Sequence, residues 1–403
     1  MRKILFFIFF SLLFAATLIS APFDPTILYL TWHSHPDTSM SIQWVTDKNH
    51  VEDYLEFNDG HSWYAVEGYH TRLNLEQSYL VHRVDLSNLN PETKYLFRLA
   101  REGKIYKFCT MPSQLTKPLR FVVGGDIYHD EIEYVSEMNQ QAAKCNPSFA
   151  LLGGDIAYAN GHRSIWQRIG MSLGMVNEKI VPWLEFLALW KKEMVTSDGC
   201  LIPIVPAIGN HDVVGGFDQT PQSAKVFYSL FPGNGYRVLD FGNYMSIVIL
   251  DSGHTHPIIG NQARWLASTL NTRQEVPHKF ALYHVGAYPS IRNFKKEEHA
   301  AIRQAWVPLF EKFGVNAAFE HHDHAYKRTH PLRKGKIDAN GVIYIGDGGW
   351  GVKKPRKPKT QEQRPYLAKS AASRSIINVT IEPEKRSFEA IDEIGNIIDS
   401  MRF

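Results

Sequence analysis

Five short polar blocks, each of which ends an apolar run, hold the residues of this sequence that are best suited to chemistry. The blocks are GGDIYHD at 124–130, GGDIAY at 153–158, GNHD at 209–212, YH at 283–284 and HHDH at 321–324. Together they supply carboxylate, phenol, amide and imidazole groups, which are side chains that bind metal ions in proteins. This set predicts a hydrolase that uses two metal ions.

The donor types favour two unequal metal sites. Carboxylate and phenolate oxygens are hard ligands that favour an Fe(III)-type ion. The amide oxygen of Asn210 and the neutral imidazoles of His284 and His322 suit a divalent ion such as zinc, iron or manganese. Asp155, which Tyr158 follows in the same turn, is placed to bridge the two ions.

The alternative interpretation of these blocks is a set of helix-capping Asp and Asn residues with incidental histidines. Capping requires neither a Tyr three residues after an Asp nor two histidines in alternation at a strand end. We therefore prefer the metal site.

The polar blocks require a scaffold that brings several strand ends together. From about Leu119 onward, short apolar runs alternate with helical patterns, which is typical of an α/β domain. Ligands of open α/β sheets bind beside the carboxyl ends of the strands, so the five blocks can converge on one crevice. Asp126 and Asp155 are about one strand–helix–strand unit apart, which predicts neighbouring parallel strands.

Three helices and a final hairpin are expected in this domain. The helices are predicted near 131–143, near 183–190 and from about 297 to 313, and the hairpin near 375–392. One face of the second helix carries large apolar side chains at helical spacing. These residues, which we interpret as core, are Trp183, Phe186, Leu187 and Trp190.

The preceding residues, from about 25 to 111, have a different pattern. Seven short alternating runs are separated by Asp, Asn, Gly and Pro turns, which predicts a β-sandwich with Trp44 in its core. The segment LNPETKY at 89–95 resembles the tyrosine-corner approach of fibronectin type III domains. Residues 112–118, polar with a proline at each end, are predicted to be a linker.

The first 21 residues predict an export signal. Arg2 and Lys3 precede an apolar run over residues 4–19, which ends at the small residues Ser20 and Ala21. A membrane anchor is the alternative, but the run barely reaches the roughly 20 residues of a spanning helix and no basic flank follows it. We expect export to a periplasm or out of the cell, and no membrane association once the signal is removed.

The overall charge argues against a nucleic-acid polymer as partner. The net charge is +3, and removal of Arg2 and Lys3 leaves +1 (3 − 2 = 1), too little to hold a polyanion. A basic run between Lys353 and Arg364 is interpreted as a solvated loop. We expect a small phosphorylated molecule as the partner.

Cysteines are too few to form the main scaffold. Cys109, Cys145 and Cys200 can make at most one internal disulfide, and none lies in a paired Cys motif. Metal binding by cysteine is not expected.

The ordered set GGD, GGDIAY, GNHD, a lone His after an apolar strand, and HDHAYKR resembles the purple acid phosphatases of the metallophosphoesterase superfamily. The resemblance implies a fibronectin type III-like all-β sandwich at 22–112 and, at 119–403, an α/β metallophosphoesterase domain built as a four-layer αββα sandwich. It also implies an acid phosphatase that hydrolyses phosphomonoesters by attack of a metal-bound hydroxide, and the predicted signal would make this an exported enzyme.

Carried over residue by residue, the resemblance implies a dinuclear centre of Fe(III) and a divalent ion (Zn, Fe or Mn). The iron ligands would be Asp126, Tyr158, His324 and the bridging Asp155, and the ligands of the second ion Asp155, Asn210, His284 and His322. His211 would be the catalytic residue that positions phosphate and helps to protonate the leaving group.

The sequence departs from the family pattern at several positions. Tyr128 and His321 stand where the family has glycine. His129 and Asp130 lie close enough to Asp126 to be alternative or supporting groups, and the alternative interpretation is a polar helix start with Asp130 near the N-cap. Strand alternation places His321 on the side opposite to the histidines of the HxH pair. We therefore expect a structural imidazole at His321.

The phosphate-contacting histidines that plant-type members carry after the lone His have no match here. Tyr288, Arg292, His254 and His256 are the candidates for substrate binding, and Arg292 is attractive because a guanidinium binds phosphate through two hydrogen bonds. Specificity is expected in the loops 161–180, 215–223 and 346–364.

Two other functions remain open. One is a metallophosphodiesterase or nucleotidase of the same superfamily, since a near-neutral charge does not exclude small nucleotides. The other is a non-catalytic β-sandwich protein for adhesion or carbohydrate binding. A binding module has no use for the intact metal-ligand set, which argues against it.

Overall fold

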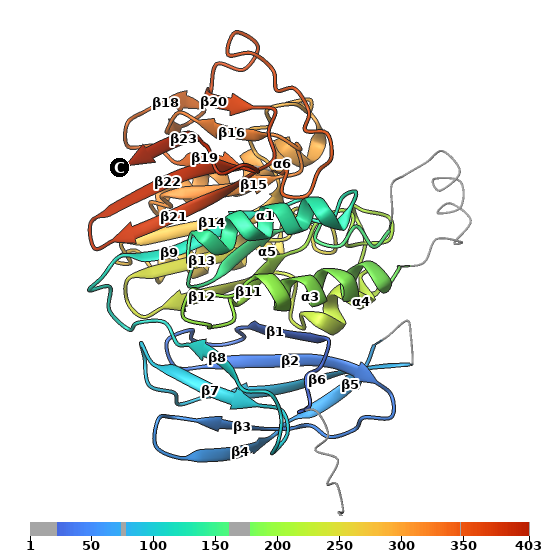
Figure 1. The fold of residues 1–403 in the computed structure, drawn as a ribbon. Coiled ribbons are helices and arrows are strands. Elements are labelled where there is room, and N and C mark those ends of the chain that lie inside the picture. The colour runs from blue at the N-terminus through green and yellow to red at the C-terminus, as the bar shows by residue number, and fades with distance from the viewer. Residues whose placement is uncertain (1–21, 74–77, 161–177, 347, 403) are drawn as a thin grey trace, which may run out of the picture.

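The computed structural model describes residues 22–73, 78–160, 178–346 and 348–402 (Figure 1). The predicted export signal and most of the loop 161–180 lie outside the described residues. Within these residues, no helix is both long and apolar enough to cross a membrane.

Residues 27–109 form two antiparallel sheets that pack face to face. One sheet has the order β1-β2-β6-β5 and the other β4-β3-β7-β8. The strands are β1 Ile27–Thr31, β2 Met40–Asp47, β3 Tyr54–Asn58, β4 Trp63–Glu67, β5 Tyr69–Arg72, β6 Tyr79–Leu86, β7 Lys94–Arg98 and β8 Tyr106–Cys109. The predicted β-sandwich is thereby confirmed.

One of the seven runs predicted to be strands, SWYAVEGY at 62–69, is in fact two strands. The run SWYAVEGY breaks at Gly68, after which the chain leaves the partner of β4 and pairs with β6 in the opposite sheet. A Cβ at Gly68 would lie 2.1 Å from the carbonyl oxygen of Arg83. Only glycine therefore allows this close crossing between the sheets.

Two predictions about the sandwich core hold. The Trp44 side chain has no exposed surface and stacks on His82 with ring centroids 5.0 Å apart. The Tyr95 hydroxyl accepts a hydrogen bond from the backbone N–H of Asn90 at 2.8 Å, the contact of a tyrosine corner.

The remaining residues form two mixed sheets. The six-stranded sheet has the order β11-β10-β9-β21-β22-β23 and the seven-stranded sheet β12-β13-β14-β15-β19-β16-β20. The first comprises β9 Leu119–Gly124, β10 Ala150–Gly153, β11 Ile204–Ala207, β21 Ser375–Glu382, β22 Lys385–Asp392 and β23 Ile397–Arg402. The second comprises β12 Arg237–Phe241, β13 Met245–Ile249, β14 His278–Val285, β15 Ala317–His321, β16 Tyr326–Thr329, β19 Ile343–Gly346 and β20 Leu367–Ala371.

Helices cover the outer faces of both sheets and make four layers. One core joins the facing sheets, with the Phe121 and Phe280 rings 5.8 Å apart. Separate cores lie under the helices of each sheet. The helices are α1 Ile132–Lys144, α3 Val181–Glu193, α4 Lys225–Leu230, α5 Asn261–Asn271, α6 Glu297–Ala305 and α7 Val307–Lys312. A 3₁₀ turn lies at Pro221–Ser223, and β17 Leu332–Arg333 and β18 Lys336–Ile337 form a short hairpin. The αββα architecture is as predicted.

Two of the three predicted helices are present as α1 and α3, the third needs a correction, and α4 and α5 were not predicted. The predicted core face of α3 is buried, and the final hairpin is present as β21 and β22. The single helix expected from about 297 to 313 is instead α6 and α7, which meet at Trp306. Pro308 has no N–H to continue a helix but suits a first turn, so the second helix begins at Val307 with Pro308 in its first turn.

Buried residues of the sandwich and of the two-sheet body pack against each other and join the two parts. Trp32, which follows β1 and has no exposed surface, lies edge-on to Phe149 and Phe241, each with ring centroids 5.8 Å away. The Tyr29 hydroxyl donates a hydrogen bond to the Leu230 carbonyl oxygen at 2.8 Å. In Figure 1, β1 runs beneath α3, with which it is in contact.

Candidate metal centre

Strand ends of both sheets deliver the predicted ligands to one place. Strands β9 and β10 are parallel neighbours, as predicted, and Asp126 and Asp155 follow them by two residues each. Asn210 follows β11, His284 lies near the end of β14, and His322 follows β15 directly. The carboxyl ends of these strands share one edge of the two-sheet body.

The backbone at this edge is strained. Among the described residues, ten non-glycine residues have a positive φ, and five of them are predicted ligands. A side chain held in this region costs about 1–3 kcal/mol, and such residues concentrate at functional sites. The five ligands are Asp126 (53°), Asp155 (53°), Tyr158 (48°), His322 (73°) and His324 (54°).

Asp126, Tyr158 and His324 form one half of the cluster. The Tyr158 hydroxyl donates a hydrogen bond to Asp126 Oδ1 at 2.8 Å and lies 3.2 Å from His324 Nε2. The same Oδ1 lies 2.9 Å from His324 Nε2, so three potential ligand atoms face one another. Asp126 Oδ2 accepts the backbone N–H of His322 at 2.8 Å, which connects this half to the other.

Asp155, Asn210, His284 and His322 form the second half. His284 Nε2 lies 3.2 Å from Asp155 Oδ2, 3.2 Å from Asn210 Oδ1 and 3.0 Å from His322 Nδ1. The other ring nitrogen, Nδ1, donates to the Gly153 carbonyl oxygen at 2.9 Å. That bond fixes the ring so that Nε2 carries the lone pair toward the cluster.

This half fits a cation better than it fits hydrogen bonds alone. Asp155 Oδ2 is buried and makes no hydrogen bond among the described residues; it faces His284 Nε2 at 3.2 Å, a contact of two lone pairs that is costly unless a proton or a cation lies there. Ligand atoms of Asp155, His284 and His322 all lie within 4.8 Å of one another. Carboxylate, amide and imidazole donors at such spacing are the donor set of a transition-metal ion.

Electrostatics of the buried groups agree with this fit. Burial lowers the pKa of His284, but the carboxylates of Asp155 and Asp126 outweigh it and raise that pKa to about 9. Burial would raise the pKa of Asp155, but the histidines His284 and His211 hold it at about 2. The carboxylates therefore favour positive charge at this point, whether from a proton or from a metal ion.

The phenol of Tyr158 is neutral without such charge. Burial, followed by the neighbouring Asp126 and Asp155 carboxylates, raises its pKa well above the ordinary value. A phenolate at this position requires a strong local cation.

His211 lies beside the cluster and not within it. Its backbone N–H donates to Asp155 Oδ1 at 2.6 Å, and its ring stacks on Tyr158 with centroids 4.5 Å apart. The side chain is partly exposed. His211 is thus placed to meet a molecule that enters the site.

Asp212 is an important residue that we did not single out from the sequence. Its carboxylate is fully buried and accepts three backbone N–H groups, those of Asp155 (2.8 Å), Gly209 (2.9 Å) and Ile156 (3.0 Å). It thereby ties the GNHD turn to the GGDIAY turn. Its position inside the GNHD block was the available signal, because a short Asp often organises neighbouring backbone.

His321 lies under the two GGD turns. A Cβ at Gly153 would lie 1.7 Å from His321 Cδ2, and one at Gly125 would lie 2.6 Å from His321 Cγ. The side chain is 2% exposed. The two glycines therefore leave the space that this imidazole fills, which agrees with the expected structural role.

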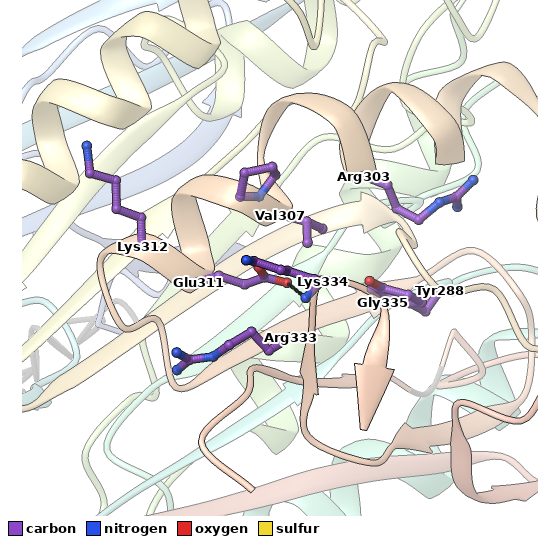
Figure 2. Close-up of a pocket in the computed structure, with 9 residues that line it drawn as sticks. Tyr288, Arg303, Val307, Glu311, Lys312, Arg333, Lys334 and Gly335 are labelled. Carbon is purple, nitrogen blue, oxygen red and sulfur yellow. Dashed lines mark hydrogen bonds between the residues drawn. The ribbon is translucent and has the colours of Figure 1, made fainter. Parts of the chain in front are cut away.

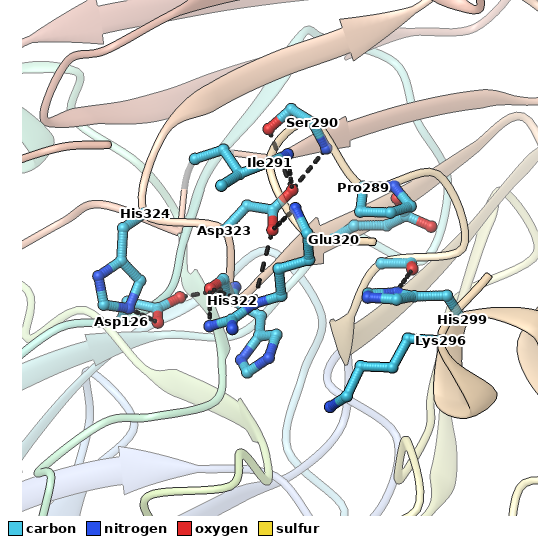
Figure 3. Close-up of polar contacts among 12 residues, drawn as sticks. Asp126, Pro289, Ser290, Ile291, Lys296, His299, Glu320, His322, Asp323 and His324 are labelled. Carbon is cyan, nitrogen blue, oxygen red and sulfur yellow. Dashed lines mark hydrogen bonds and ion pairs between the residues drawn. The ribbon is translucent and has the colours of Figure 1, made fainter. Parts of the chain in front are cut away.

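The segment after β14 is organised by Asp323, the central residue of the HHDH block (Figure 3). Its Oδ2 accepts the backbone N–H groups of Ser290 at 2.5 Å and Ile291 at 2.9 Å. The Arg292 guanidinium donates to the His322 carbonyl oxygen at 2.9 Å and lies 3.6 Å from Asp323 Oδ1. Of the four predicted substrate-binding residues, Arg292 is the one that lies beside a ligand and is partly exposed.

Of the other three candidates, Tyr288 and His254 are buried and His256 packs on an aromatic ring, although His254 also lies against the ligand His284 with ring centroids 5.7 Å apart. Tyr288 is 3% exposed and packs on Tyr344 at 4.5 Å, at the wall of a cavity of about 520 Å³ near α6 and α7 (Figure 2). His254 has no exposed surface, and its ring nitrogens pair with the Gly216 carbonyl oxygen and the Ser252 hydroxyl behind His284. His256 packs against Tyr236 with ring centroids 5.3 Å apart.

Tyr128 and His129, which follow Asp126 closely in the sequence, point to different places. The Tyr128 hydroxyl donates to Glu185 on α3 at 2.9 Å, away from the ligands. The His129 ring lies 4.7 Å from both the Tyr158 and His324 rings, and its Nδ1 pairs with Asp130 Oδ2 at 2.6 Å. His129 therefore borders the Asp126 half of the cluster.

Two family models match this chain. The model described as "Purple acid Phosphatase, N-terminal domain" matches residues 25–110, and the one described as "Calcineurin-like phosphoesterase" matches residues 119–326. The second match alone covers just over half of the chain.

Relatives agree with these matches. Purple acid phosphatase 18 of Arabidopsis thaliana is 25% identical over 327 residues, which are 78% of this chain and 69% of that protein. Purple acid phosphatase 21 of the same plant is 26% identical over 345 residues, 80% of this chain and 72% of that protein. Among solved structures, purple acid phosphatase PPD1 from yellow lupin (Lupinus luteus) seeds has the same fold, with a TM-score of 0.70 at 17% identity over 93% of this chain and 73% of that one.

Proposed function

The chain belongs to the calcineurin-like phosphoesterase family and carries the purple acid phosphatase N-terminal domain, and on this premise we propose that it is an exported phosphomonoesterase with a dinuclear metal centre. One observation carries the proposal. Seven potential ligands from five separate segments come together, and one of them, Asp155, has a buried Oδ2 that makes no hydrogen bond among the described residues and faces His284 Nε2 at 3.2 Å.

The two halves of the cluster suit different ions. Asp126, Tyr158, His324 and Asp155 would hold Fe(III), and Asp155, Asn210, His284 and His322 would hold zinc, iron or manganese in the divalent state. When bound, such a pair supplies Lewis-acid polarisation of the phosphoryl group and an activated water.

The protein's own groups would then orient the phosphoester. The partly exposed His211 ring, stacked on Tyr158, is placed to hold a phosphoryl oxygen and to protonate the leaving group. The Arg292 guanidinium, anchored on the His322 carbonyl oxygen, would pair with a second phosphoryl oxygen. Asp126, Asp155 and His284 have no exposed surface, so bulk water does not compete for the ligand atoms.

Elemental analysis with a visible spectrum tests the metal assignment. We expect about two metal ions per chain, one of them iron, and a tyrosinate-to-iron absorption band that is lost in Tyr158→Phe. Tyr128→Phe is the matched control, because Tyr128 points to Glu185, and it should keep the band. A colourless protein with one metal ion or none would refute the assignment.

A comparison of substrates tests the reaction. With both metals at saturation, we expect the chain to hydrolyse p-nitrophenyl phosphate much faster than bis-p-nitrophenyl phosphate. Faster hydrolysis of the diester would instead support the metallophosphodiesterase. An Asp155→Asn protein that keeps the full biological activity would favour the non-catalytic binding protein.

Export is proposed from the character of residues 1–21 alone. Amino-terminal sequencing of the protein recovered outside the cytoplasm of its host tests it. A mature chain that begins near Pro22 is expected, and an intact Met1 on exported protein would contradict cleavage.

A further inference from the structure

Two of the three cysteines meet where the sandwich touches the two-sheet body. Cys109 ends strand β8 of the sandwich, and Cys200 lies between α3 and β11, 91 residues further along the chain. Their sulfur atoms are 2.9 Å apart. A disulfide has a length of about 2.05 Å, so small side-chain rotations close the remaining distance.

The backbone holds both cysteines in this position. Lys107 of β8 forms a parallel bridge with Cys200, and the Leu201 N–H donates to the Lys107 carbonyl oxygen at 2.9 Å. The turn that carries Cys200 is closed by Thr196, whose hydroxyl oxygen accepts the Cys200 N–H at 2.9 Å. The pairing of the sulfurs is therefore a property of two fixed backbones and not of one mobile loop.

A salt bridge beside the sulfurs joins the same two segments. Lys94 is the cross-strand partner of Cys109, and its ammonium lies 2.5 Å from Asp198 in the Cys200 turn. This ion pair therefore helps the backbone to hold the Cys109 strand against the turn that carries Cys200.

We propose that Cys109 and Cys200 form a disulfide that cross-links the sandwich to the two-sheet body. Cys109 is partly exposed whereas Cys200 is buried, so the reaction begins at Cys109. Its thiolate attacks one sulfur of a low-molecular-weight disulfide such as oxidised glutathione and releases one glutathione thiol. The Cys200 thiolate then attacks the Cys109 sulfur, a second glutathione thiol leaves, and each leaving thiolate takes up the proton of one cysteine.

The third cysteine supplies an internal control. Cys145 follows helix α1, its thiol donates to the Gln141 carbonyl oxygen at 3.4 Å, and burial raises its pKa to about 11. It is therefore a poor nucleophile at neutral pH. Oxidation should leave Cys145 as the one remaining thiol.

Thiol counting on the full chain is the first test. After equilibration with oxidised glutathione and denaturation, we expect one reactive thiol per chain, and three after reduction. Tryptic digestion without reductant should yield residues 108–120 joined to residues 193–225, two hydrogens lighter than the separate peptides. Three thiols after oxidation, a stable glutathione adduct on Cys109 or a cross-link to Cys145 would overturn the proposal.

Thermal unfolding of variants is the second test. The oxidised wild type should lose roughly 5–10 °C of midpoint temperature on reduction, because the cross-link closes a long loop. Cys145→Ser should lose as much, and Cys109→Ser should lose nothing. The same shift in midpoint temperature on reduction for all three proteins would contradict the cross-link. If a variant fails to fold, the peptide map of the wild type still tests the proposal.

Discussion

Gly153→Ala should damage the candidate metal centre through a neighbour that touches no substrate. The new methyl group would lie 1.7 Å from His321 Cδ2 and 2.0 Å from its Nε2. Normal carbon contacts are about 3.5–4.0 Å, so the ring or the β10 strand must move by roughly 2 Å. The Gly153 carbonyl oxygen accepts the His284 Nδ1 hydrogen bond at 2.9 Å, and a shift of the strand would disturb it.

The expected magnitude follows from overpacking. Extra methyl groups in a packed interior cost about 1–3 kcal/mol, and because a displacement of roughly 2 Å is large, we expect about 3 kcal/mol at Gly153. His321→Ala alone should also destabilise the protein, since it empties a buried space. In the double variant the methyl group occupies vacated space, so the two changes should be less than additive by about 1–3 kcal/mol.

Urea unfolding of the wild type, both single variants and the double variant measures this coupling. Metal content of the same four proteins shows whether the His284 contact is disturbed. Additive effects of the two substitutions, or a Gly153→Ala protein as stable as the wild type, would refute the argument that His321 fills the space under the GGD turns.

Other predictions concern groups that support the cluster. Asp212→Asn should lower stability by about 1–3 kcal/mol and reduce turnover at least about tenfold, because an amide cannot accept three backbone N–H groups. Thermal unfolding and enzyme kinetics test this prediction, and an unchanged midpoint temperature with unchanged turnover would contradict it. Lys327→Met should lower the free energy of unfolding by about 3–5 kcal/mol, because it removes the ion-pair partner of the buried Glu320 carboxylate. Adding Glu320→Gln should recover part of that loss in the same unfolding assay. No recovery would count against the ion pair. Burial lowers the pKa of His278 to about 4, so the unfolded chain binds this proton more tightly than the folded one. Stability should therefore fall as the pH drops from about 6.5 toward 4, and His278→Gln should show a smaller fall than the wild type between pH 7.5 and pH 5.0; an equal fall would exclude His278 as the cause.

Much of the architecture was readable because local patterns and tertiary structure agree. Polar residues after apolar runs at Asp126 and Asp155 predicted parallel neighbours, and β9 and β10 are parallel neighbours. The apolar face of the helix around Trp183 predicted burial, and that face is buried. In each case one periodicity, of a strand or of a helix, is sufficient for the prediction.

Failures occur where a non-local contact decides the structure. The break at Gly68 exists because the Arg83 carbonyl oxygen of a distant strand approaches it, which no local pattern reveals. His254 was a candidate for substrate binding, yet the Gly216 carbonyl oxygen holds it behind the cluster. Asp212 was overlooked because two of its three partners are backbone groups of another turn, 56 and 57 residues away along the chain.

The position of Trp32 limits how this chain can be recombined. The 112–118 linker looks like a natural crossover point for chimeras, but a cut there separates Trp32 from Phe149 and Phe241, the aromatic rings that enclose it. A foreign sandwich without a matching indole would leave a cavity between the two sheets, and a foreign body without the phenyl rings would leave the indole in water. A chimera made at this junction should therefore keep both sides of the aromatic contact from the same parent.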